Sequence, residues 1–298
     1  MPNPTITGSS YSGSFAGKYI AASLFSAKTL DEGSITILPN IKFKAAMKVG
    51  AFSNLVRSAD CDFDSTTSGL TLTEKVLTPT ELQVNLQVCK KELHSDWEAA
   101  QMGFSAFDEL PPLFSDFVIA RVAAEVAQAT ETSIWSGSAG EGNFDGLVTL
   151  AGADSDVVDV SGIAITSSNV IAEIAKVVDA IPSGVYGSDD LHIYISSHIA
   201  KQYIAAQAAL GYRELYNVGQ TEMNFQGIPL FVTKGLGDNA MMAARKSNLF
   251  FGTGLLNDRN ETRVLDMADL DGSQNVRVIM RYTAGVQIGV GSDVVLYS

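Results

Sequence analysis

The chain has 298 residues, of which 46% are apolar and 18% charged, and its formal net charge is −13. This composition predicts a globular protein with one large domain or two connected ones. The negative charge argues against a sequence-specific DNA-binding surface, which needs clustered lysine and arginine. Two cysteines are too few for a disulfide framework, and no apolar run reaches the roughly 20 residues that cross a bilayer. We expect a protein of a reducing compartment that is not secreted and has no membrane segment.

The charge is distributed unevenly. Residues 1–60 carry a net charge of +3, which leaves −16 for the rest of the chain. The basic groups of this end are Lys18, Lys28, Lys42, Lys44, Lys48 and Arg57. Such an end is either a solvated tail or a segment that lies on the acidic body of a neighbouring copy. Charge alone leaves these two readings open.

The first ninety residues have the patterns of extended structure. Residues 1–14 are rich in Ser, Gly and Pro, and the apolar spacing of 15–30 predicts a short helix inside an extended arm. Apolar and polar residues alternate over 35–49 and 70–89, with turn formers between them, which predicts a long two-stranded projection. A ribbon with so few apolar residues is poorly stable alone. A partner subunit is one candidate for what covers it.

A long helix is predicted after the break at Pro111 and Pro112, ending near Trp135. Its apolar residues recur every four positions: Phe114, Val118, Val122 and Val126. Gly137 and Gly140 are expected to end it. About 23 residues span roughly 35 Å, a length typical of a strut, although an ordinary core helix remains the alternative.

The second half of the chain reads as a small α/β unit followed by strands. We expect a helix capped by Ser168, a buried strand at 191–196 and a second helix over 197–210. After Gly211 the chain is mostly short strands separated by Gly, Asp and Asn turns. The predicted fold class is α+β.

No catalytic, cofactor or metal site is predicted. The series Asp60, Asp62 and Asp64 opens like a calcium loop, but Ser65 and Thr71 stand where glycine and glutamate are required. The three histidines lack zinc spacing, and the usual acyl-transfer and nucleotide motifs are absent from the sequence.

Neither cysteine is expected to be a nucleophile. Cys89 reads as a buried small hydrophobe, and the acids around Cys61 disfavour its thiolate. A rival hypothesis is an enzyme whose active site lies in the α/β unit, around Asp189, Asp190, His192 and His198.

Taken in order, these elements resemble the major capsid proteins of tailed bacteriophages with the Hong Kong 97-type fold, closest to those of Bacteroidetes phages and prophages. The segments that carry the resemblance include AGKYIAASL, LTLTEKVLTPTELQVNLQVC, ETSIWSGS followed by GNFDGL, and NLFFGTGLLND followed by RYTAGVQIGVGSDVVLY. The likeness covers nearly the whole chain, but none of these motifs is diagnostic alone.

The resemblance implies a domain organisation. Residues 1–34 would form an N-terminal arm, and 38–75 an extended β-hairpin loop that reaches over an adjacent subunit. Residues 76–146 and 226–298 would form a peripheral domain with a spine helix at 112–135. Residues 147–225 would form an axial α/β domain.

The implied function is structural and not enzymatic. The chain would self-assemble into pentamers and hexamers of an icosahedral shell around double-stranded DNA, which it contacts non-specifically. It would assemble in the host cytoplasm and belong to the virion, with portal, scaffolding and decoration proteins as partners. The alternative with the same fold is an encapsulin-type compartment that holds a cargo enzyme.

The six basic residues Lys18, Lys28, Lys42, Lys44, Lys48 and Arg57 are the candidate intersubunit contacts. Some relatives join subunits by a bond between lysine and asparagine, and Lys42, Lys44 and Lys48 lie on the loop. Electrostatic contacts are the preferred interpretation, because no partner asparagine with an assisting glutamate is recognisable.

Overall fold

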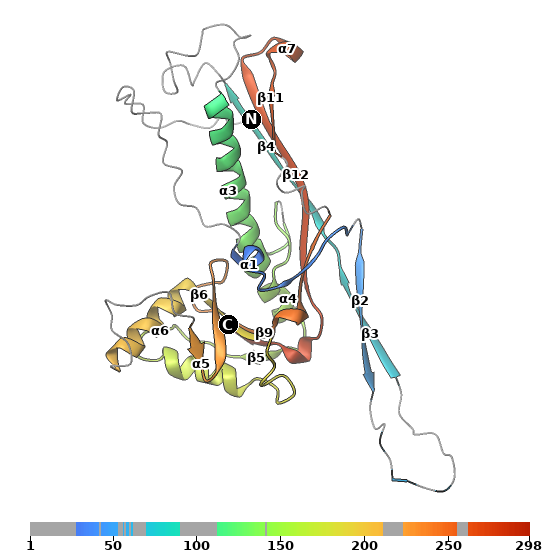
Figure 1. Ribbon diagram of the computed structural model, residues 1–298, viewed down its shortest axis with the longest axis vertical. Coiled ribbons are helices and arrows are strands. Elements are labelled where there is room, and N and C mark those ends of the chain that lie inside the picture. Colours follow the sequence, from blue (N-terminus) through green and yellow to red (C-terminus); the bar gives the residue numbers. More distant parts are fainter. Residues whose placement is uncertain are drawn as a thin grey trace.

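The structure is a computed structural model. It describes residues 28–298 with the exception of 42, 53–55, 57, 60, 62–69, 90–111, 141, 211–222 and 255–261. The predicted arm helix lies mostly outside the described residues, as do Asp60, Asp62 and Asp64. Figure 1 shows an elongated molecule with a small α/β unit at one side of its lower half and a narrow ribbon projecting on the other.

Helices and strands alternate irregularly along the chain. The helices are α1 (Lys28–Asp31), α3 (Pro112–Ser136), α4 (Leu147–Ala153), α5 (Val170–Asp179), α6 (Ser197–Ala209) and α7 (Ala268–Asp271). The strands are β1 (Thr36–Leu38), β2 (Ala45–Phe52), β3 (Leu70–Leu77), β4 (Thr80–Cys89), β5 (Val158–Val160), β6 (Leu191–Ser196), β7 (Asn224–Phe225), β8 (Ile228–Thr233), β9 (Met241–Arg245), β10 (Leu249–Thr253), β11 (Thr262–Asp266), β12 (Asn275–Ile288) and β13 (Val295–Tyr297). The α+β class predicted from the sequence is confirmed.

The larger sheet is built around the 14-residue strand β12. It runs β1-β10-β12-β11, and β4 pairs with β12 along the opposite edge. Apolar residues at every second position of β12, such as Val276, Val278 and Met280, are buried. α3 lies along the sheet (Figure 1), and its last turn contributes the fully buried Ile134 and Trp135 to the same core.

The smaller unit is a six-stranded sheet of order β5-β13-β9-β6-β8-β7. β6 pairs in parallel with β8 and antiparallel with β9, so both of its edges are hydrogen-bonded, and its apolar side chains are buried on both faces. α5 and α6 pack on this sheet and on each other, around Ile174, Ile193 and Ile199. The strand and both helices predicted for 168–210 are confirmed.

The start of α5 differs from the prediction. Ser168 is not its N-cap, because the helix begins at Val170 with Asn169 in the cap position. The Asn169 side chain accepts a hydrogen bond from the Thr166 backbone N–H at 2.7 Å. That bond closes a turn before the helix and holds Ser168 outside it.

The two-stranded projection is shorter than predicted. β2 and β3 form a separate antiparallel ribbon whose register runs from Ala45 opposite Leu77 to Phe52 opposite Leu70. β4 does not continue this ribbon, because all ten of its residues pair with β12. The chain changes sheets at Thr78 and Pro79, where proline removes a backbone donor from the ladder. Cys89, at the end of β4, is half-buried and not buried as expected.

Candidate interaction surface

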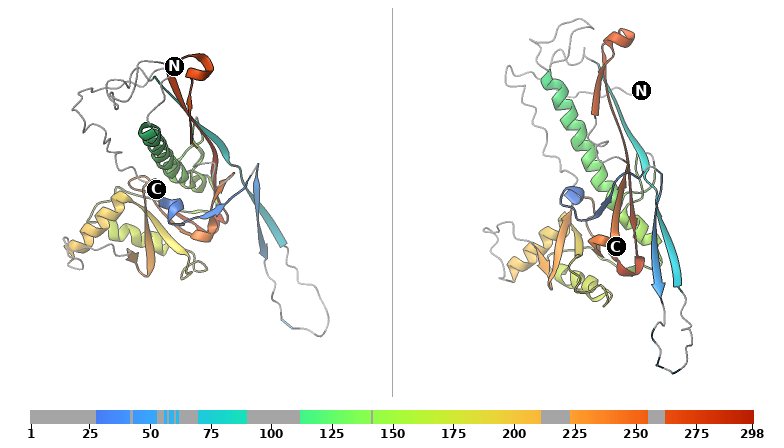
Figure 2. Two further views of the ribbon diagram at one scale, coloured as in Figure 1. Left: turned by 45° about the horizontal axis from the view of Figure 1, so that its top comes forward. Right: turned by 45° about the vertical axis from the view of Figure 1, so that its right-hand side comes forward.

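The ribbon formed by β2 and β3 stands apart from both hydrophobic cores (Figures 1 and 2). Leu72 on β3 is 63% exposed, and Phe43, just before β2, is 82% exposed. An isolated two-stranded ribbon is marginally stable in water. Large exposed apolar side chains on and beside such an element make it a candidate surface for contact with another protein.

Charged residues of the ribbon pair across its two strands. Lys48 on β2 is the register partner of Glu74 on β3, and both side chains are exposed. Opposite charges in this position contribute roughly 0.2–1 kcal/mol to strand pairing. This pair of opposite charges favours the observed register, while both side chains remain exposed.

The base of the ribbon is packed tightly onto the larger sheet. Leu77, the last residue of β3, is completely buried against Gly252 of β10, where an added Cβ would lie 2.1 Å from the leucine Cδ2. The Gln287 side chain donates a hydrogen bond to the Val76 carbonyl at 3.0 Å. The ribbon is therefore joined to the body at the end where β12 meets β10.

An ion pair ties the same end of the ribbon to the helix α4. The Lys75 ammonium lies 2.6 Å from the carboxylate of Asp154, the residue that follows the last turn of α4 and donates its backbone N–H to the Ala151 carbonyl. The contact with Lys75, more than any other, holds the pKa of Asp154 below its usual range, and the Asp156 backbone N–H lowers it further. The pair connects the ribbon to the body, since its partners lie 79 residues apart on β3 and directly after α4.

A double-mutant cycle of Lys75→Met and Asp154→Asn is expected to give a coupling energy of about 0.5–1 kcal/mol in urea unfolding, since Lys75 is partly exposed. Because the pKa of Asp154 is lowered in the folded chain, its contribution is complete above the ordinary value of 3.8 and is lost as pH falls through the lowered value. Additive single-mutant effects at neutral pH would contradict the pair.

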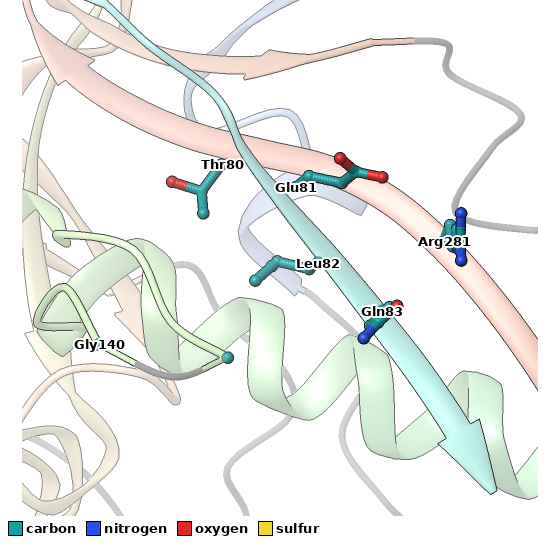
Figure 3. A pocket seen from close by; sticks show the side chains of 7 residues that line it. Thr80, Glu81, Leu82, Gln83, Gly140 and Arg281 are labelled. Atoms are coloured by element: carbon teal, nitrogen blue, oxygen red, sulfur yellow. The ribbon is translucent and has the colours of Figure 1, made fainter.

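An open cavity of about 560 Å³ lies beside the start of β4 (Figure 3). Its lining is Thr80, Glu81, Leu82, Gln83, Gly140, Gly142 and Arg281. These side chains offer a carboxylate, a guanidinium and an amide at an open surface, which suits polar contact with another macromolecule. Within the described parts of the chain, no group of three or more His, Cys, Asp or Glu side chains could hold a metal ion.

Three of the six predicted contact residues belong to the described structure. Lys44 and Lys48 are exposed at and on the ribbon. Lys28 instead faces its own chain: its ammonium donates to the Val232 carbonyl at 3.4 Å and lies 5.2 Å from the centre of the Phe231 ring. Lys18, Lys42 and Arg57 lie outside the described residues. Their role in contacts between subunits stays a prediction.

Three residues of the rival enzyme hypothesis, Asp190, His192 and His198, make local structural contacts. The Asp190 carboxylate accepts from the Ser247 hydroxyl and backbone N–H, and this hydroxyl contact lowers the pKa of Asp190. His192 contacts the Asp190 carbonyl through Nδ1, and His198 lies 3.4 Å from the Gln202 amide. These contacts join loops and successive helical turns.

In the described residues, no helix is long and apolar enough to cross a membrane.

Solved structures of known proteins share this architecture over almost the entire chain. The capsid of a native GTA particle matches with a TM-score of 0.66 at 14% identity, covering 100% of this chain and 95% of the other. The capsid of Myoviridae phage XM1 gives 0.62 at 12%, covering 94% of each chain. A structure of Mycobacterium phage Adephagia gives 0.61 at 14%, covering 98% and 94%. No family model and no curated protein sequence matches the chain.

These likenesses establish the class of fold. The chain has the mixed helix and strand fold of the capsid proteins of phages and GTA particles. The resemblance to capsid proteins with the Hong Kong 97-type fold is thereby confirmed at the level of the fold.

Proposed function

We propose that this chain is the major capsid protein of a tailed phage, a structural protein without enzymatic activity. The observation that carries the proposal is the ribbon of β2 and β3, which projects from the body (Figure 1) and has the exposed apolar residues Leu72 on β3 and Phe43 just before β2. A fold shared end to end with capsid proteins supports the same function. The shell would consist of pentamers and hexamers enclosing double-stranded DNA.

In this proposal the parts of the chain have separate tasks. Residues 1–34 are the N-terminal arm and 38–75 the extended loop, which includes β2 and most of β3. Residues 76–146 and 226–298 form the peripheral domain with α3 as its spine helix. Residues 147–225 form the axial domain near the symmetry axes. Two hydrophobic cores, one around β12 and one around β6, support a chain of two domains. The strands β8, β9 and β13, which belong to 226–298, pair within the smaller sheet of β6.

Assembly would proceed through heterologous contacts, in which the ribbon of one copy lies on the body of the next. Each copy both gives and receives a ribbon, so the buried surface accumulates around the ring beyond a standard interface of ~1,600 Å². Lys44 and Lys48 would add electrostatic contacts to the acidic body of the neighbour. Packaged DNA would be contacted non-specifically, because the chain has a net charge of −13.

The proposed setting is the virion, after assembly in the host cytoplasm. A shell of this kind needs a portal at one vertex for DNA, and scaffolding and decoration proteins are the further partners proposed. Their contacts would fall on the faces that remain exposed after the ribbons are placed.

Electron microscopy of the purified protein, expressed with and without its neighbouring genes, tests the function directly. We expect closed shells or five- and six-membered rings, and nucleic acid inside particles made with the packaging genes. A stable monomer under every condition would overturn the proposal. Shells that hold only a co-purifying enzyme would point to an encapsulin-type compartment instead.

A further inference from the structure

A buried carboxylate joins α1 to the last turns of α3. Glu131 is completely buried, and it accepts hydrogen bonds from the Thr29 hydroxyl at 2.5 Å and the Thr29 backbone N–H at 3.1 Å. The Trp135 indole N–H, one helical turn further on, donates to the same hydroxyl at 2.8 Å. Thr29 and Trp135 are also completely buried. One threonine of a four-residue helix thus satisfies two polar groups of α3.

These hydrogen bonds place α1 against the core around β12. Leu30 packs in the core around β12, and the Tyr194 hydroxyl of β6 donates to the Ser34 carbonyl at 2.6 Å. Contacts to α3, to the core around β12 and, through Ser34, to β6 therefore hold this segment in place.

The charged groups near Glu131 are few and come from two directions. On α1, Lys28 contacts the Val232 carbonyl and, at 3.6 Å, Glu32. From the loop after β8, the Lys234 backbone N–H contacts the Glu131 carboxyl, and its side-chain charge acts on it more weakly. The neutral donors, Thr29 and the Lys234 backbone N–H, act on the carboxylate more strongly than the Lys234 charge does. Burial of a carboxylate under these conditions is costly.

Either protonation state can be accommodated at this position. The ionised carboxylate accepts from the Thr29 hydroxyl and N–H. When protonated, Glu131 can donate to the hydroxyl oxygen, because a hydroxyl is both donor and acceptor. Only the ionised form pays the desolvation cost, and burial accordingly raises the pKa of Glu131 against the lowering effect of Thr29 and Lys234.

We propose that Glu131 is a protonation-dependent latch that holds α1 against the end of α3. Undocking of α1 would expose Glu131 to water, where its pKa returns toward 4.5. A group whose pKa is higher in the docked state favours docking at low pH, and this contribution is lost as pH rises through the raised value. Within that window the docking equilibrium changes by up to about tenfold per pH unit.

Fluorescence of Trp135 in the full-length, unassembled chain tests the latch. Trp97→Phe leaves Trp135 as the sole tryptophan, because the chain contains two. As the pH rises from the ordinary glutamate value of 4.5 through the raised value, we expect a shift of the emission to longer wavelength, with faster hydrogen exchange of residues 28–36 after correction for intrinsic rates. Glu131→Gln, which stays neutral, is expected to remove this pH dependence. Glu125→Gln, an exposed position on the same helix, is the matched control and should keep it.

Two outcomes would overturn the latch. One is a wild-type chain whose emission does not change across this range, and the other is a Glu131→Gln chain with the wild-type transition. If Glu131→Gln does not fold, Thr29→Val tests the same contact by changing the hydrogen-bond partner of Glu131. It keeps the shape of the side chain and removes the hydroxyl, so we expect exposed Trp135 at both ends of the range and no transition. A wild-type profile in that variant would equally refute the proposal. The measurement does not depend on whether the chain forms shells.

Discussion

Replacing Leu72 with aspartate is expected to abolish shell assembly while changing the unfolding temperature of the isolated chain by less than about 3 °C. Leu72 is 63% exposed in the single chain, so the aspartate loses little contact there. In the proposed shell the same position is covered by a neighbouring copy. A buried, unpaired carboxylate at that interface costs several kcal/mol per contact, repeated in every subunit.

Electron microscopy and analytical ultracentrifugation of the variant measure assembly, and circular dichroism measures the fold. Leu72→Ile, which keeps the apolar surface, is the matched control and should assemble. Phe43→Asp tests the same surface from the base of the ribbon, where the ring is 82% exposed. Shells of normal yield from both aspartate variants would show that the ribbon is not an assembly contact, even if the chain is a capsid protein.

The sequence predicted the ribbon because alternation of apolar and polar residues is a local signal. It could not predict where the ribbon ends, because β3 and β4 alternate equally well and differ only in their partners. β3 pairs with β2, whereas β4 pairs with β12, some 190 residues further along the chain. Pro79 was the available signal, since proline rarely continues a ladder.

The long helix was predictable for a similar reason, and its ends at Pro112 and Ser136 agree with the breaks in the sequence. Its buried polar contacts were not. Nothing near Glu131 in the sequence indicates that Thr29, 102 residues away, satisfies it. Spacing alone would place this glutamate on the solvated face of a helix, and only the tertiary contact explains its burial.

The candidate contact surface was predicted in part. The basic character of the N-terminal end led to six residues, of which Lys44 and Lys48 are exposed at the ribbon. The apolar positions Phe43 and Leu72 were missed, because an exposed apolar residue and a buried one look alike in an alternating strand. The Lys75–Asp154 pair was also missed, since it depends on how the ribbon meets α4.

Two glycines, one in the segment ETSIWSGS and one in GNFDGL, allow the end of α3 and the start of α4 to lie close together. Gly137 ends α3 and Gly146 precedes α4, and the Gly146 N–H donates to the Gly137 carbonyl at 2.9 Å. A Cβ on Gly146 would lie 2.7 Å from three backbone atoms, those of Ser133, Trp135 and Gly137. Its φ of −83° suits any residue, so the requirement for glycine is one of space.

Gly146→Ala is therefore expected to destabilise the chain by about 2–4 kcal/mol, because rigid backbone must move to admit one methyl group. Urea unfolding followed by circular dichroism measures the change. Gly184→Ala is the matched control: its Cβ would meet nothing within 4 Å, and we expect an effect within about 0.5 kcal/mol. Equal stability of the two variants would show that α3 and α4 can separate at little cost. A loss confined to Gly146→Ala would instead mean that the close contact between Gly137 and Gly146 sets the distance between α3 and α4.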